Sequence, residues 1–136
     1  MDRETMVRMC LVTFFGGGLG SLFRFLLSWW VASRFGESFP AGTVIVNISG
    51  CFVIGILAAL FAADGSMLVS PFARQFLMIG ILGGYTTFSS FSLQTLLLAR
   101  DGQWLYATGN VVLSVVLCLV GVWLGYAVGQ AVSGWR

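Results

Sequence analysis

The chain has 136 residues, of which 58% are hydrophobic and only 9% charged, with a mean hydropathy of +0.95 and a net charge of +2. A soluble domain carries about a quarter charged residues, so this composition excludes a soluble globular protein and indicates an integral membrane protein. The few scattered arginines argue against nucleic-acid binding. The lack of histidine in the sequence, with only three widely spaced cysteines, argues against a zinc site or a histidine-based catalytic triad.

Four apolar segments are long enough to cross a bilayer, which takes about 20 helical residues. Short connectors holding proline, glycine or charged residues separate them, and no alternating pattern suggests a β-barrel. We predict an all-α integral membrane protein with a single transmembrane domain over residues 1–136. Its helices are expected at roughly 9–33, 41–63, 72–99 and 104–132.

The first span carries a positive charge, Arg24, at membrane depth, where polar groups are costly and usually functional. The span is too long for a removable signal peptide and has no small-residue cleavage site. Gly16 and Gly20 are four residues apart, a spacing that predicts close packing against a neighbouring helix.

The second span contains one amide, Asn47, followed at helical spacing by Cys51 and Gly55. The small side chains predict another close helix contact. Asn47 has two open interpretations: it contacts a transported ion, or it is a hydrogen-bonding clamp between helices.

The third span contains the most informative segment, the run from Gly80 to Ser92. Two adjacent glycines followed by β-branched threonines and several serines form a poor continuous helix, so we predict that this helix is broken in mid-membrane. Non-helical backbone at that depth must be buried in protein or line a cavity. The alternative is a kinked packing helix lined by hydroxyl groups.

Past the predicted break, Phe88 and Phe91 share one helix face, and Thr87 and Ser90 form the adjacent strip. Hydroxyl groups and the positive edges of aromatic rings are able to meet a small anion without any formal charge. Two phenylalanines on one face are also typical of an ordinary core, and that interpretation stays open.

The fourth span carries Gly121, Gly125 and Gly129 at four-residue intervals, which predicts close packing in lipid.

The arginines give only a weak signal for orientation in the membrane. Four helices place both termini on one side, and the arginines of that side outnumber those of the other side by four to two. The first group is Arg3, Arg8, Arg74 and Arg136, and the second is Arg34 and Arg100. We therefore infer dual topology and an antiparallel homodimer, with a single orientation as the alternative.

No aspartate or glutamate lies inside any predicted span. The spans therefore offer no proton carrier for coupled transport and no carboxylate ring for cation selectivity. A passive anion path fits these residues better than a pump, and with no buried base to activate a hydroxyl we do not expect an enzyme.

Together these motifs resemble the Fluc family of bacterial fluoride channels, also called CrcB-like proteins. The resemblance covers essentially the whole chain. Its landmarks are Gly17-Gly18-Leu19-Gly20 followed by Arg24, then Gly42-Thr43 leading to Asn47, and then Gly83-Gly84-Tyr85-Thr86-Thr87-Phe88-Ser89-Ser90-Phe91-Ser92.

The resemblance implies passive export of fluoride across the bacterial inner membrane by an antiparallel, dual-topology homodimer with two pores. It also implies a structural sodium ion at the dimer interface, held by the main-chain carbonyls of Gly83 and Thr86. The implied pore residues are Phe88, Phe91, Asn47, Ser90 and Thr87, and Arg24 would lie in a vestibule that attracts anions.

The fourth span departs from the family pattern, in which several hydroxyls follow the last helix. Asn110 and Ser114 are present, but Cys118 and Val122 stand at the next positions. The contribution of this helix to the ion path therefore stays open.

Two other functional classes remain as alternatives. A small multidrug-type transporter with dual topology also has four short helices, but it relies on a membrane glutamate where the first span here has Arg24. A purely structural assembly protein would explain the glycine stripes but not the hydroxyl-rich third span.

Overall fold

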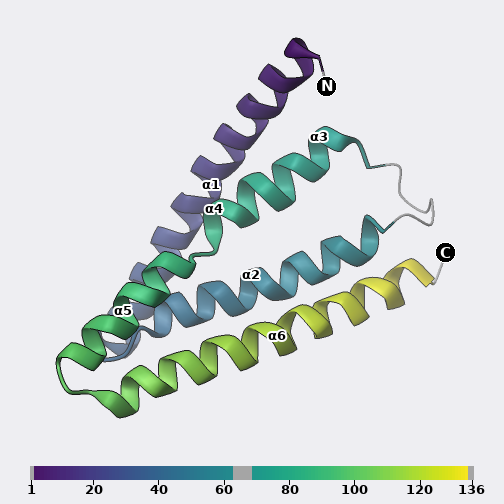
Figure 1. The fold of residues 1–136 in the computed structure, drawn as a ribbon. Coiled ribbons are helices and arrows are strands. Elements are labelled where there is room, and N and C mark those ends of the chain that lie inside the picture. The colour runs from purple at the N-terminus through teal and green to yellow at the C-terminus, as the bar shows by residue number, and fades with distance from the viewer. Residues whose placement is uncertain (1, 63–68, 135–136) are drawn as a thin grey trace.

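The computed structural model describes residues 2–62 and 69–134, and these residues form helices with no strand among them. Four helical spans are long and apolar enough to cross a membrane, as predicted. The first, second and fourth spans are each one continuous helix, whereas the third span is interrupted (Figure 1). The elements are α1 (Arg3–Phe35), α2 (Ala41–Leu60), α3 (Pro71–Arg74), the π-helix η1 (Gln75–Leu82), α4 (Gly83–Tyr85), α5 (Phe88–Arg100) and α6 (Trp104–Gly134).

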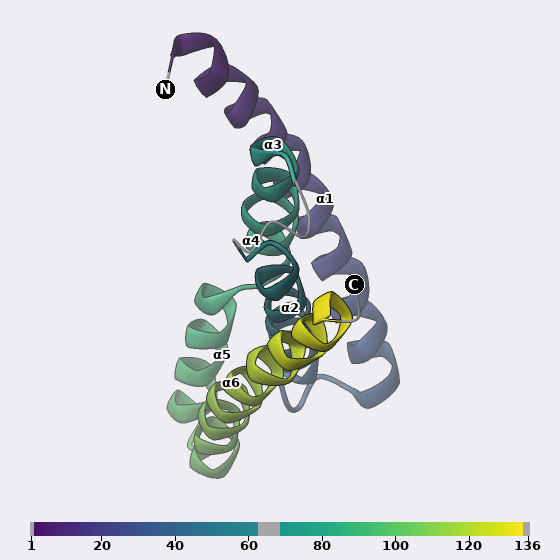
Figure 2. The same cartoon turned by 90° about the vertical axis from the view of Figure 1, so that its right-hand side faces the viewer.

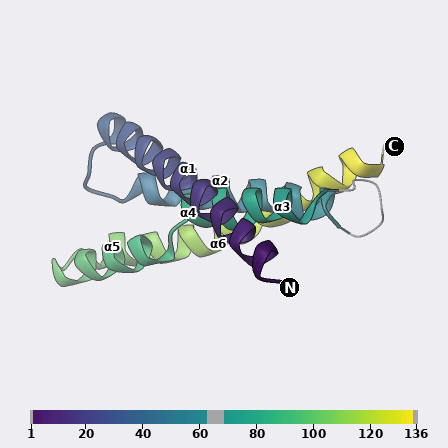
Figure 3. The same ribbon diagram turned by 90° about the horizontal axis from the view of Figure 1, so that it is seen from above.

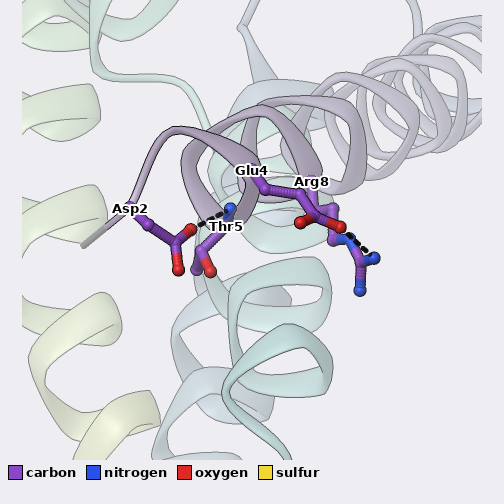
Figure 4. Close-up of polar contacts among 4 residues, drawn as sticks. All are labelled: Asp2, Glu4, Thr5 and Arg8. Atoms are coloured by element: carbon purple, nitrogen blue, oxygen red, sulfur yellow. Dashed lines mark hydrogen bonds and ion pairs between the residues drawn. The ribbon is translucent and has the colours of Figure 1, made fainter.

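Helix α1 begins at Arg3, well before the predicted residue 9, because a polar N-terminal turn stabilises it (Figure 4). The Asp2 carboxylate accepts a hydrogen bond of 2.7 Å from the Thr5 N–H, an N-cap that also holds the pKa of Asp2 below its usual value. Glu4 and Arg8 form an exposed ion pair one turn apart. The helix therefore extends past its apolar part. The predicted end of the second span, residue 63, lies outside the described residues.

The helix ends gather at two opposite ends of the molecule (Figure 1). The start of α1, the end of α2, the start of α3 and the end of α6 point toward one end, and residues 36–40 and 101–103 form the other. This arrangement agrees with four crossings. Of the arginines counted for orientation, Arg136 lies outside the described residues.

Glycines bring the helices together in two pairs, α2 with α6 and α1 with the first half of the third span (Figure 2 and Figure 3). A Cβ atom at Gly125 would overlap the carbonyl oxygen of Phe52, and one at Gly129 would lie 2.7 Å from the carbonyl oxygen of Ile56. On the other side, a Cβ atom at Gly16 would lie 2.9 Å from the Cα of Gly80. The predicted close packing of these glycine stripes is confirmed.

The α2–α6 contact gives a direct test of this packing. Gly125→Ala forces a methyl group onto the α2 backbone, and overpacking of this kind costs about 1 to 3 kcal/mol. We expect a lower melting temperature of the purified protein in detergent. Gly109→Ala on the same helix is the matched control, because no atom lies within 4 Å of a Cβ there and alanine favours helix. Equal melting temperatures for the two variants would contradict this account.

Candidate functional site

The third span is broken at Thr86 and Thr87, both of which have extended backbone, with ψ angles of 156° and 114°. The predicted break is confirmed, but it lies two residues beyond the glycine pair. Gly83 and Gly84 are themselves helical. The reason is packing: a Cβ atom at Gly84 would overlap the carbonyl oxygen of Gly17, so this glycine serves close approach to α1. The β-branched threonines accept the extended conformation readily.

Asn47 holds the broken backbone through both ends of its amide. Its Nδ2 donates to the Thr87 carbonyl at 3.0 Å, and its Oδ1 accepts from the Thr87 N–H at 2.8 Å. An unpaired backbone group in lipid costs several kcal/mol, so this two-point contact satisfies the extended residue where a helix no longer does. The clamp interpretation of Asn47 is confirmed, and its place on an ion path stays a prediction.

The break diverts two backbone donors from their usual acceptors. In a continuous helix the N–H of Thr87 would bond the carbonyl of Gly83, and that of Ser90 the carbonyl of Thr86. Here Thr87 donates to Asn47, and Ser90 donates to the Thr87 hydroxyl at 3.2 Å. The carbonyls of Gly83 and Thr86 thus lose their ordinary helical donors. Gly83 is exposed on the single chain and Thr86 is half-buried.

These two carbonyls fit the sodium ion that the family resemblance implies. Unwound backbone carbonyls at a helix break are donors for Na⁺, and a hard cation prefers oxygen ligands. Among the described residues, no group of three or more His, Cys, Asp or Glu side chains could hold a metal ion. Gly83 and Thr86 also line one cavity together.

A cluster of hydroxyl groups surrounds the first turn of α5. The Thr87 hydroxyl accepts from the Ser90 N–H as the N-cap, donates to the Ser90 hydroxyl at 3.1 Å, and lies 3.2 Å from the Ser89 hydroxyl. The N-terminus of a helix carries a partial positive charge. Uncharged donors and a helix dipole therefore meet at the same point.

Phe88 and Phe91 share one face of α5, as predicted, with ring centroids 5.1 Å apart. Phe91 is buried, whereas Phe88 is 77% exposed on the single chain. Both line a cavity of about 400 Å³, together with Asn47 and Thr87. Of the remaining predicted pore and vestibule residues, Ser90 and Arg24 are not part of its lining.

Arg24 is half-buried on α1 and is linked to the break through Ser21. Its Nη2 lies 3.5 Å from the Ser21 hydroxyl, which lies 3.4 Å from the carbonyl oxygen of Gly84. No acidic side chain of the described residues forms an ion pair with Arg24. The guanidinium is therefore a positive charge near the broken helix, and its vestibule role stays a prediction.

Helix α6 contributes polar atoms that the sequence left undecided. Asn110 is fully buried and donates to the Thr95 hydroxyl of α5 at 2.8 Å, and Ser114 donates to Asn110 at 3.5 Å. Ser114 and Cys118 line the same cavity as the phenylalanines. Thr95 was not singled out in the sequence, although it lies one turn after Phe91, on the same side of α5.

Ser49 and Tyr85 form a second polar contact that sequence reasoning missed, with their hydroxyls 2.8 Å apart. The contact joins α2 to the last residue before the break. Nothing in the local pattern of either residue identified its partner.

Comparison with known proteins places these features in a family. The family model for the CrcB-like protein, Camphor Resistance (CrcB), matches residues 11–126. A protein of Opitutus terrae named fluoride-specific ion channel FluC is 61% identical over 111 residues, which cover 82% of this chain and 84% of the relative.

Two further relatives carry the same name. The one from Rhodospirillum rubrum is 59% identical over 111 residues, covering 82% of this chain and 86% of its own. The one from Methylocella silvestris is 51% identical over 118 residues, covering 87% and 90%.

The Asn47 clamp is testable by hydrogen exchange. Asn47→Ala removes the acceptor of the Thr87 N–H, so we expect faster deuterium uptake in the peptide that contains Thr87. Asn47→Asp is the matched variant, because a carboxylate keeps the acceptor and loses only the donor to the Thr87 carbonyl. Its uptake should rise less than that of Asn47→Ala. Slow exchange in both variants would show that something other than Asn47 protects this amide.

Proposed function

The chain belongs to the CrcB-like family, a multi-pass membrane protein family, and from that membership we propose that it is a passive, fluoride-selective channel and not an enzyme. The observation that carries the proposal is the 61% identity to a relative named fluoride-specific ion channel. The broken third span supports it, because it gathers hydroxyl and amide groups and ring edges without a carboxylate in the cavity lining.

Fluoride is small and strongly hydrated, so its dehydration must be offset by several close donors. The Ser90 hydroxyl, which accepts from Thr87 and keeps its own hydrogen, the positive N-terminus of α5 and the ring edges of Phe88 and Phe91 supply such donors. None of these groups carries a full charge. Conduction requires sites that an ion is also able to leave, and weak donors meet that requirement better than a buried arginine would.

We further propose an antiparallel, dual-topology homodimer with two pores. The near balance of arginines supports insertion in both orientations. The exposure of Phe88 and Gly83 on the single chain leaves both residues available to a second chain. Such a dimer would lie in the bacterial inner membrane, where lipid covers the apolar surfaces that remain.

In this dimer the carbonyls of Gly83 and Thr86 from both subunits would hold a structural sodium ion. The ion would join the two breaks and add positive potential near the anion path. The diverted helical donors support this assignment, because they leave the two carbonyls open for such a contact. Through such a channel, fluoride that has entered the cell as the neutral acid would leave it passively.

A multidrug-type transporter is not favoured. The apolar part of α1 has no acidic side chain, since Asp2 and Glu4 belong to its exposed first turn. A proton-coupled exchanger would need such a group within the membrane.

Purified protein in liposomes loaded with potassium fluoride should release fluoride when valinomycin balances the charge, with no proton gradient. We expect little chloride release from matched vesicles, because the relative from Opitutus terrae is named a fluoride-specific channel. A fluoride electrode and a chloride electrode measure the two rates, and protein-free liposomes give the background. Equal rates for the two ions would remove the selectivity claim, and background rates for both would remove the channel.

Replacing either aromatic ring of the cavity should slow fluoride release. Phe88→Ile and Phe91→Ile remove ring edges while keeping apolar bulk, and we expect at least about a tenfold loss for each, the scale of one lost ion contact of about 1.4 kcal/mol. Phe35→Ile is the matched control, because Phe35 is an exposed phenylalanine at the end of α1. Size-exclusion chromatography checks that each variant keeps its assembly state. Unchanged release in both cavity variants would place the pore elsewhere.

A further inference from the structure

Three sulfur-containing side chains from three different elements line the cavity beside the phenylalanines. They are Cys51 of α2, Met78 of η1 and Cys118 of α6. The chain has one other cysteine, Cys10, which is exposed near the start of α1 and does not line this cavity. On sequence alone, Cys51 is predicted only to be a small residue at a close helix contact.

The glycine contact between α2 and α6 brings the two cysteines together. A Cβ atom at Gly121 would lie 3.3 Å from the carbonyl oxygen of Ile48, so the two backbones nearly touch at this level. The two helices run in the same direction (Figure 1), and a Cβ atom at Gly55 would overlap the carbonyl oxygen of Val122. Cys51 lies one turn before Gly55, and Cys118 lies one turn before Val122. Both are half-buried and line the same cavity.

The cavity lining contains no charged residue. A hard cation would find few charged partners beside the cysteines, whereas thiolate and thioether groups select soft metal ions. Charge balance further restricts which metal ion would bind, because a buried net charge is costly. A divalent soft ion that binds two thiolates forms a neutral complex, and Hg²⁺ binds two thiolates in this way without further ligands.

We propose that Cys51 and Cys118 form a binding site for a soft, thiophilic metal ion, with Met78 as a weaker third ligand. On binding Hg²⁺, the two S–H bonds break, two Hg–S bonds form, and two protons pass to water. Its sulfur ligands differ from those of the proposed sodium site, the backbone oxygens of Gly83 and Thr86, although both residues line the same cavity.

The same site predicts an effect on transport, which rests on the proposed function. A bound ion would occupy the cavity that Phe88 and Phe91 line and would obstruct the anion path. Fluoride release from liposomes should therefore slow when Hg²⁺ is present.

Binding is measured on the purified full chain carrying Cys10→Ser, so that the exposed thiol does not compete. Titration with HgCl₂ is followed by proton release and by the ultraviolet absorbance of the mercury–thiolate bonds. We expect one Hg²⁺ bound and two protons released per chain. Adding Cys51→Ser or Cys118→Ser should weaken binding at least about a hundredfold, the loss expected when two tethered ligands become one. Met78→Leu should weaken it less.

Equal affinity in the Cys10→Ser protein and in the variants that also lack Cys51 or Cys118 would overturn the site. Release of fewer than two protons would overturn the two-thiolate complex. The transport arm compares Hg²⁺ inhibition of the Cys10→Ser protein with that of Cys10→Ser, Cys118→Ser. Inhibition of the first alone supports obstruction of the path, and inhibition of both overturns it. If the protein conducts no fluoride, the proposed function fails, and the binding titration still decides the metal site.

Discussion

The rest of the structure depends on the need to satisfy every backbone hydrogen bond inside the membrane. A helix meets that need by itself, and a broken helix does not. At Thr87 the missing partners are replaced by one side chain, since Asn47 gives an acceptor to its N–H and a donor to its carbonyl. A hydroxyl has a single oxygen, so it could not reach both the N–H and the carbonyl of Thr87 as the two ends of an amide do. A charged side chain would add a desolvation cost. An amide at this position on α2 is what allows the third span to change direction in lipid.

Diverting two N–H groups has opposite effects on the two sides of the break. On the α4 side, the carbonyls of Gly83 and Thr86 lose their helical donors, and we propose that a cation binds there. On the α5 side, the Thr87 hydroxyl caps the helix, and the partial positive charge of its N-terminus remains. Cation-favouring and anion-favouring groups thus lie within a few residues of each other without any ionised side chain. The polarity of the site comes from backbone direction.

The sequence predicted the four spans and the broken third helix because hydropathy and helix propensity are local properties. It did not locate the break within the run, because a glycine that breaks a helix and a glycine that packs against Gly17, as Gly84 does, look the same in a sequence. The start of α1 was missed because Asp2 caps the helix with a side-chain hydrogen bond, and a hydropathy profile contains no information on capping. The hydrogen bonds of Asn47 to Thr87 and of Asn110 to Thr95 join different helices, so they depend on the distance between those helices. At Asn47 the distance depends on Gly50, one turn later, which packs directly against the Thr86 side chain.

The uneven burial of the two phenylalanines bears on how much of the ion path one chain provides. Phe91 is packed inside the single chain, whereas Phe88, whose ring is 5.1 Å away, is 77% exposed. An aromatic ring that faces only lipid would gain little from the hydroxyl groups beside it. In the proposed dimer a second chain would cover Phe88, and its own α5 would meet the same surface from the opposite direction. The anion path would then be bounded by both subunits, and dissociation of the dimer would open the path to lipid. Under that proposal, conduction and assembly depend on the same residues, and a monomer would carry half of the lining and no closed pore.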